Sequence, residues 1–149
     1  MAIGELAIRQ VVVASRETPV LDAAKLMRQY HVGDIVVTEA SGGKQKPVGM
    51  VTDRDIVLEV LAQDLDVTKL SVGDIMSSDL VTVRESEGVL QTIQLMRAKG
   101  VRRTPVVDQE GALIGIISAD DFIELLSDEL AAVAKLISRE QKHEAEVRR

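Results

Sequence analysis

The chain has no cysteine and no tryptophan, and its only aromatic residues are Tyr30 and Phe122. Without cysteine, a disulfide, a thiolate metal site and a cysteine nucleophile are all excluded. Two aromatic rings do not make a stacking platform for single-stranded nucleic acid. A net charge of −6 at pH 7 also disfavours a partner that presents a phosphate backbone. Nucleic acid is therefore a disfavoured partner.

Membrane and catalytic signals are missing as well. No apolar run approaches the length of a membrane span, and the N-terminus has Glu5 and no signal-peptide pattern. We therefore expect a cytoplasmic protein. The two histidines, His31 and His143, lack the convergent ligands that a metal needs. No Ser/His/Asp constellation or glycine-rich phosphate loop is evident, so we expect no enzyme, no metal and no required cofactor.

What the chain does have is an internal repeat. Residues 3–38 match residues 72–107 at an offset of 69, and residues 49–56 match residues 115–122 at an offset of 66. The first copy thus has three extra residues, which we place in the polar loop 41–46. A copy of about 60 residues has a marginal core by itself, so the copies are expected to pack together. Such a repeat predicts a pseudo-twofold axis, with a ligand cleft between the copies.

Each copy reads as strand, helix, strand, strand and helix, which is a mixed α/β (α+β) fold. In the first copy we expect strands over 10–14, 34–38 and 47–51, the last two as an antiparallel hairpin, with a final helix over 53–62. Thr18 is expected to cap the first helix, Pro19 to open it and Gly33 to stop it. The second copy has strands over 80–83, 104–107 and 112–117, a helix from the Ser86 cap to Gly100, and a long helix from about Ala119.

The last helix carries a single apolar stripe. Its members step by 4, 4, 3 and 4 residues and are Phe122, Leu126, Leu130, Val133 and Ile137. The stripe closes the chain's own core, or its later half meets a second subunit. The pattern leaves both interpretations open.

Motifs in matching order indicate a known family. Both copies end alike, as Gly49-Met50-Val51-Thr52-Asp53-Arg54-Asp55 and Gly115-Ile116-Ile117-Ser118-Ala119-Asp120-Asp121, and the second copy adds Gly73-Asp74-Ile75-Met76 and Thr104-Pro105-Val106-Val107-Asp108. The chain resembles a tandem pair of cystathionine beta-synthase (CBS) domains, or Bateman module. The resemblance implies packed sheets with flanking helices, repeats over 3–66 and 72–130, and an extension over 131–149.

The resemblance also implies a stand-alone regulatory module that binds an adenosine ligand. AMP, ADP or ATP is the expected ligand, with NAD and S-adenosylmethionine as alternatives. It further implies a homodimer and an unidentified regulated protein as partners.

By that resemblance the ribose ligands are Thr52, Asp55, Ser118 and Asp121. A carboxylate can accept hydrogen bonds from both ribose hydroxyls. Ser/Thr-x-x-acid is also a capping-box pattern, which is the competing interpretation. Capping boxes favour the longer Glu or Gln over Asp at the third position, which speaks for the ligand.

Phosphates need positive charge, and the candidates are Arg102, Arg103 and Arg54. Arg102 and Arg103 match Gly33 and Asp34 in the first copy, so the two clefts are expected to differ. The alternative interpretation is that the arginines are ordinary solvated surface residues. For the base we expect apolar strand residues, although most could simply be core: Val12, Val13, Val32, Val36, Val81, Val83, Val101 and Pro105.

Two functions follow from these patterns. The first is a sensor that changes conformation or assembly when an adenine nucleotide binds. The second is a ligand-free dimeric scaffold for protein interactions, for which the duplicated Asp would serve no purpose.

Overall fold

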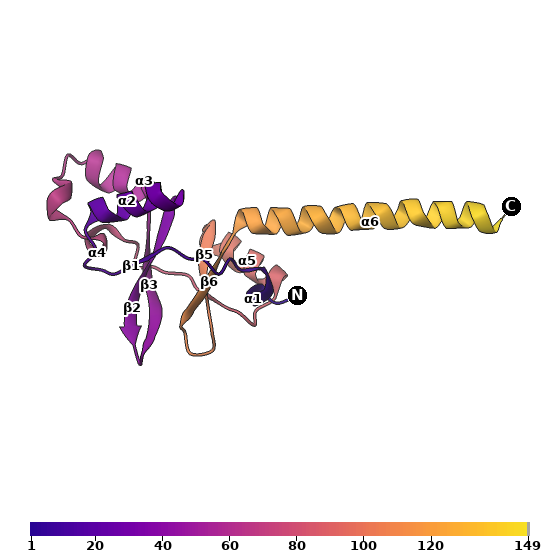
Figure 1. The fold of residues 1–149 in the computed structure, drawn as a ribbon, viewed down its shortest axis with the longest axis horizontal. Coiled ribbons are helices and arrows are strands. Elements are labelled where there is room, and N and C mark those ends of the chain that lie inside the picture. The colour runs from indigo at the N-terminus through magenta and orange to yellow at the C-terminus, as the bar shows by residue number, and fades with distance from the viewer. Residues whose placement is uncertain (149) are drawn as a thin grey trace. The chain divides into compact units, whose positions relative to one another are not determined.

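The computed structural model describes residues 1–148 and divides into two compact units, Met1–Ile117 and Ser118–Arg149. The first unit holds both sheets and the helices that precede the last one (Figure 1). The second unit is a single long helix. No helix among residues 1–148 is long and apolar enough to span a bilayer.

The first repeat forms a three-stranded sheet in the order β1-β2-β3. β1 (Val13–Ala14) runs parallel to β2 (Asp34–Ser41), and β2 pairs antiparallel with β3 (Lys44–Thr52). The hairpin expected from the sequence is confirmed, and its strands extend to the turn at Gly42 and Gly43, which both have positive φ. The helices of this repeat are α1 (Ile3–Leu6), α2 (Val20–Tyr30) and α3 (Asp53–Ile56), which continues as a π-helix over Val57–Leu61.

The second repeat forms a sheet of the same order, β4-β5-β6. β4 (Val83–Arg84) runs parallel to β5 (Arg103–Val107), which neighbours β6 (Leu113–Ser118). The 3-10 helix Val67–Lys69 and α4 (Val72–Ile75) lead into this repeat, and α5 (Val89–Lys99) connects β4 to β5. In both repeats only two residues of the first strand pair with the next strand, so the strand is shorter than predicted. In the second repeat it also ends one residue later than predicted, at Arg84.

The leading segment of each repeat, residues 3–8 in the first and 72–77 in the second, hydrogen-bonds to the opposite repeat. The Gly4 amide donates to the Glu85 carbonyl at 2.9 Å, and the equivalent Gly73 amide donates to the Arg16 carbonyl at 2.8 Å. The same exchange joins each segment to the last strand of the opposite repeat, as antiparallel bridges between Ile8 and Ile116 and between Met50 and Ser77. Every bond has its counterpart 69 or 66 residues away, so the pseudo-twofold axis expected from the repeat is present within the first unit.

Two equivalent glycines make this exchange sterically feasible. A Cβ on Gly49 would lie 2.7 Å from the Ser77 carbonyl oxygen, and one on Gly115 would lie 2.9 Å from the Ile8 carbonyl oxygen. Both distances are well inside van der Waals contact. Glycine at this strand position thus lets the opposite repeat's backbone pair closely.

At α2 the exchange also replaces the expected helix cap. Thr18 and Ser86 were predicted as N-caps, but α2 and α5 begin at Val20 and Val89, after Pro19 and Gly88. The Val20 amide instead donates to the Leu70 carbonyl at 3.0 Å, on the segment that leads into the second repeat. Backbone from the other repeat therefore does what a side-chain cap would do.

The stop signal of α2 was also placed two residues too late. The left-handed cap is His31, with φ of 55°, and its equivalent after α5 is Gly100, with φ of 66°. Gly33 lies beyond the cap, where its carbonyl accepts a hydrogen bond from the Asp53 amide at 2.9 Å. Gly33 thus connects α2 to the start of α3 instead of ending α2.

The core is aliphatic, as the composition predicts. The strand pair β2-β3 contributes Ile35, Val37 and Val51, all fully buried, and α2 adds Ala23 and Met27. Val72 from the second repeat's leading segment belongs to the same cluster. The two repeats thus share part of one core, as expected for copies too small to fold separately.

The second unit is the helix α6 (Ala119–Val147). Its N-terminus is a capping box in which the Ser118 side chain accepts from the Asp121 amide and the Asp121 carboxylate accepts from the Ser118 amide. Phe122 is buried, whereas the later members of the predicted stripe are at least half exposed. Those members are Leu126 (51%), Leu130 (72%), Val133 (53%) and Ile137 (50%).

Candidate functional site

A cavity of about 560 Å³ lies between the two repeats of the first unit. This volume is within the range of sites that hold a small ligand. The cavity gathers seven of the residues predicted from the sequence, from both repeats, and they are Thr52, Arg54, Asp55, Val81, Val101, Arg102 and Arg103. It is the candidate site, and we call it the inter-repeat cleft.

Thr52 and Asp55 stand where β3 passes into α3. The Thr52 hydroxyl accepts a hydrogen bond from the Asp55 amide at 3.0 Å, and the Asp55 Oδ2 accepts one from the Thr52 amide at 2.9 Å. The pair is therefore a complete capping box, which satisfies two amides of the first helical turn. Capping fixes both side chains at the edge of the cleft.

The capping box leaves hydrogen-bonding capacity unused on both side chains. An ionised carboxylate has about four acceptor positions, and a hydroxyl that accepts one bond still carries a proton to donate. Asp55 spends one position on the Thr52 amide. Its other oxygen can accept from the hydroxyls of a diol, and the Thr52 proton can be donated to a diol or a phosphate in the cleft.

The same box occurs twice more in the chain. Ser118 and Asp121 form it in the second unit, and Ser71 and Asp74 form it at the start of α4, away from the cleft lining. The argument that Asp is too short for a capping box is therefore wrong. Aspartate closes all three boxes with amide-to-carboxylate distances of 2.8–2.9 Å.

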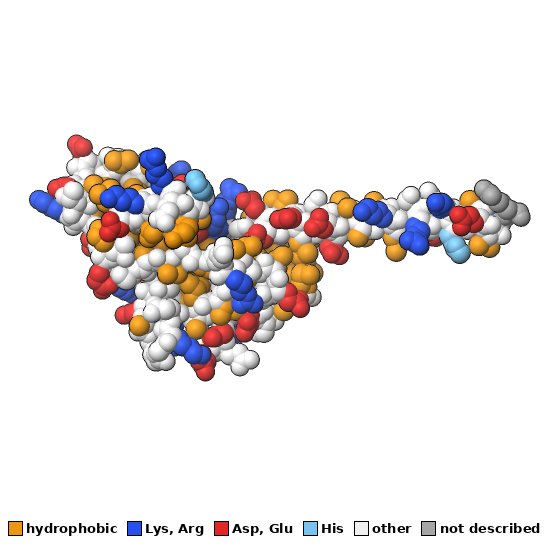
Figure 2. All heavy atoms as spheres, in the orientation of Figure 1, with side chains coloured by type: hydrophobic (Ala, Val, Ile, Leu, Met, Phe, Trp, Pro, Cys, Tyr) orange, Lys and Arg blue, Asp and Glu red, His pale blue; other side chains and the backbone are white. Residues whose placement is uncertain are grey.

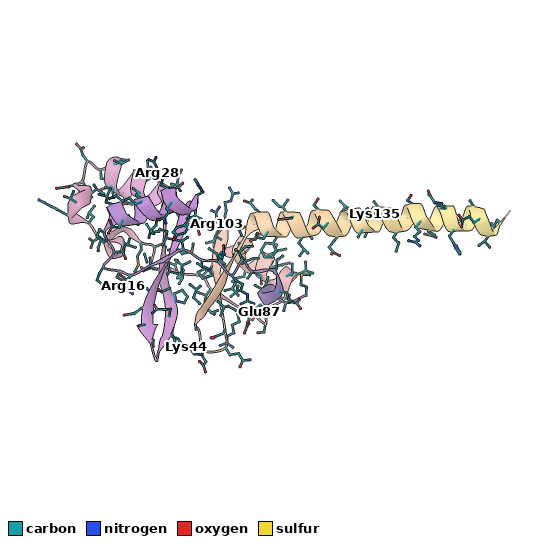
Figure 3. The ribbon with its side chains drawn as sticks, in the orientation of Figure 1. Arg16, Arg28, Lys44, Glu87, Arg103 and Lys135 are labelled. Carbon is teal, nitrogen blue, oxygen red and sulfur yellow. The ribbon has the colours of Figure 1, made fainter. Side chains whose placement is uncertain are left out.

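Arg103 lies opposite its own repeat equivalent. Its Nε is 3.1 Å from Oδ1 of Asp34, and the Asp34 side chain is only 11% exposed. Burial raises the pKa of Asp34 above its ordinary value, although the Arg103 charge opposes that shift. The nearby Asp53 carboxylate raises the Asp34 pKa further. One of the predicted phosphate ligands is thus already engaged by a carboxylate. Arg103 is labelled in Figure 3.

The apolar part of the cleft comes mainly from the second repeat. Leu80, Val81 and Val101 line it, and the Val81 carbonyl accepts a hydrogen bond from the buried Thr104 hydroxyl. Leu80 and Val81 lie before β4, in the segment that was expected to be strand. Because this segment does not pair, its side chains and backbone border the cleft.

The other predicted base contacts lie elsewhere. Val36 is 0% exposed and Val83 is 3% exposed, and Pro105 is also buried, so these side chains belong to the interior. Val12, Val13 and Val32 line a second hollow of about 610 Å³ within the first repeat, together with Tyr30. Ser118 and Asp121 belong to the second unit, where they cap α6.

Several lining residues were not predicted as site residues, among them Gly33, Asp34, Met50, Asp53, Ser77, Asp79, Leu80 and Gly100. The repeat offset carried a signal for Asp34. A pseudo-twofold axis sets equivalent positions against each other, so the match of Asp34 to Arg103 already suggested that they face each other. Asp34 has no local motif of its own, so only the repeat match to Arg103 could have indicated it.

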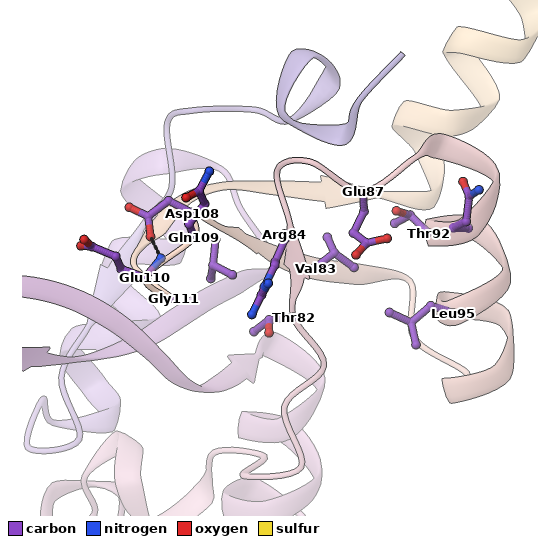
Figure 4. A pocket seen from close by; sticks show the side chains of 12 residues that line it. Thr82, Val83, Arg84, Glu87, Thr92, Leu95, Asp108, Gln109, Glu110 and Gly111 are labelled. Atoms are coloured by element: carbon purple, nitrogen blue, oxygen red, sulfur yellow. Dashed lines mark hydrogen bonds between the residues drawn. The ribbon is translucent and has the colours of Figure 1, made fainter.

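A third hollow, of about 520 Å³, is formed within the second repeat (Figure 4). The Asp108–Gly111 turn borders one side, and Thr92 and Leu95 of α5 border the other. Asp108 accepts hydrogen bonds from the Glu110 and Ala112 amides, so its carboxylate serves the turn. Among residues 1–148, no group of three or more His, Asp or Glu side chains is placed to hold a metal.

Comparison with known proteins agrees with this architecture. The CBS domain family profile matches residues 3–62 and again residues 72–128. The CBS domain-containing protein YhcV of Bacillus subtilis is 37% identical over 126 residues, which cover 84% of this chain and 86% of YhcV. The protein MK0525 of Methanopyrus kandleri is 34% identical over 125 residues, and the match spans 84% of this chain but only 62% of MK0525.

A solved structure gives the same fold. The CBS domain protein PAE2072 of Pyrobaculum aerophilum, complexed with AMP, superposes with a TM-score of 0.72 at 30% identity. The superposition covers 81% of this chain and 89% of PAE2072. On the profile, the relatives and the fold together, this chain belongs to the CBS domain family and carries the domain twice.

Proposed function

We propose that the protein is a regulatory module that binds an adenosine ligand in the inter-repeat cleft. The observation that carries the proposal is the gathering in one cavity of a fixed carboxylate and hydroxyl, an apolar wall and three arginines. These are the groups that a ribose, an adenine and a phosphate each require. The AMP in the Pyrobaculum aerophilum relative supports the choice of ligand class.

Each part of the ligand has a place in this proposal. The Asp55 carboxylate accepts hydrogen bonds from the ribose hydroxyls, and the Thr52 hydroxyl donates to the 5′ side of the ligand. The adenine packs against Leu80, Val81 and Val101. Arg54, Arg102 and Arg103 supply the positive charge for a phosphate, and Arg103 already pairs with Asp34.

Regulation follows if the ligand binds one arrangement of the repeats better than another. The cleft borrows its walls from both repeats, so a bound ligand bridges them. A partner protein would then read the changed surface. No catalytic step is proposed, because the Asp55 carboxylate binds a sugar and has no reacting group to serve.

A thermal-shift panel tests the proposal. AMP, ADP, ATP, NAD and S-adenosylmethionine are added at millimolar concentration, and at least one should raise the melting temperature by preferential binding to the folded state. Asp55→Ala should remove most of that rise and also lower the ligand-free stability by about 1 kcal/mol through loss of the cap.

The matched control is Asp74→Ala. It destroys an equal Ser-x-x-Asp box outside the cleft, so it should cost similar stability while it keeps the full ligand response. An equal loss of response in both variants would show that Asp55 acts only through helix capping.

A ligand-free scaffold is the second candidate function. The exposed apolar stripe on α6 favours it, and apolar side chains are visible along this helix in Figure 2. The repeated Asp no longer argues against a scaffold, because capping alone gives that residue a purpose. A flat response across the whole panel would favour the scaffold.

A further inference from the structure

The charge of the inter-repeat cleft is unusual for a site meant to hold phosphates. Its charged lining residues are four aspartates and three arginines, which are Asp34, Asp53, Asp55, Asp79, Arg54, Arg102 and Arg103. With all of them ionised, the lining has a formal net charge of −1. A ligand with several phosphates would therefore meet a field that does not compensate its charge.

Asp34 neutralises the positive charge of Arg103. Its carboxylate Oδ1 lies 3.1 Å from Arg103 Nε in an ion pair, and its side chain is less exposed than that of the arginine, at 11% against 44%. A phosphate that recruits Arg103 must compete with this carboxylate and leave a buried acid without its partner. Such an unpaired buried charge is costly.

We infer that Asp34 is a specificity-determining residue, which restricts the cleft to adenosine ligands with at most one phosphate or with an uncharged or cationic 5′ substituent. This inference rests on the proposed function and names its ligand class. The burial that raises the Asp34 pKa is consistent with it, because a second anion nearby would be still less favourable.

The test is the affinity of adenosine, AMP, ADP and ATP for wild type and Asp34→Asn, measured by calorimetric titration. Asparagine keeps the shape but releases Arg103. The affinity for ATP relative to adenosine should rise roughly tenfold or more, with AMP rising less and adenosine almost unchanged. The melting temperature of each variant establishes that it is folded.

Two further variants isolate the ion pair. Asp79→Asn makes the same formal change in the lining without touching Arg103, and it should raise the ATP preference far less. In an Arg103→Gln background, Asp34→Asn should have almost no effect on the preference, because the coupled partner is gone.

The possible outcomes distinguish a failure of this inference from a failure of the proposed function. If Asp34→Asn and Asp79→Asn act alike, or if the wild type already prefers ATP to AMP, the inference is overturned while the proposed function stands. If no adenosine compound binds the wild type, the proposed function fails and the inference fails with it.

Discussion

The two repeats differ in charge at a pair of equivalent positions that both line the cleft. Positions 33 and 34 of the first repeat are Gly33 and Asp34, and their equivalents in the second are Arg102 and Arg103. The backbone around them is nearly the same, with the same exchanged leading segments and the same sheet order. Duplication thus kept the backbone contacts that hold the repeats together, and divergence changed the charge on each side of the cleft.

The contacts that were kept depend on glycine, and breaking them should have the largest effect. Gly49→Val would force a side chain against the Ser77 carbonyl and Met76, so we expect a loss of about 2–3 kcal/mol in unfolding free energy. Gly111→Ala is the control, since its φ is +83° but no atom lies within 4 Å of the added Cβ. It should lose only about 1–2 kcal/mol, through backbone strain.

Chemical denaturation measures both variants. A loss for Gly49→Val no larger than that for Gly111→Ala would mean that the close approach of the other repeat does not require glycine at position 49. Gly115→Val should behave like Gly49→Val, because its added Cβ would lie 2.9 Å from the Ile8 carbonyl.

The smallest expected effect sharpens the comparison of the two helix ends. His31 occupies a left-handed cap that its equivalent, Gly100, occupies without strain. His31→Gly should therefore stabilise the protein by up to about 1 kcal/mol, and Gly100→Ala should destabilise it by a similar amount. Thermal unfolding of both variants is the measurement, and a destabilised His31→Gly would show that the imidazole makes a contact of greater value.

The sequence predicted the architecture well because repetition is a global signal. The offsets of 69 and 66 residues foretold two like units, and the hairpin and the helices over 20–30 and 53–61 follow from local patterns. The Thr18 cap was wrongly predicted because Thr18 has the right chemistry, yet the Leu70 carbonyl of the other repeat accepts from the first amide of α2. Ser86 lies too far before α5, which begins at Val89. No local pattern encodes such a long-range replacement.

The candidate site was predicted in part for a similar reason. Thr52 and Asp55 were predicted from a motif of the family that the chain resembles, and the arginines from their charge. Asp34 looks like an ordinary strand residue, and only its position across the axis gives it a role. Val36 and Val83 show the reverse case, since strand residues of the right type are as often interior as they are part of a cleft wall.

A crystal structure of the protein with AMP tests the central claim most directly. The proposal predicts the adenosine in the inter-repeat cleft, with its ribose hydroxyls within hydrogen-bond distance of the Asp55 carboxylate and its base against Val81 and Val101. An empty cleft at saturating AMP, with Asp55 bonded only to the Thr52 amide, would contradict it, as would AMP bound in the hollow beside the Asp108–Gly111 turn.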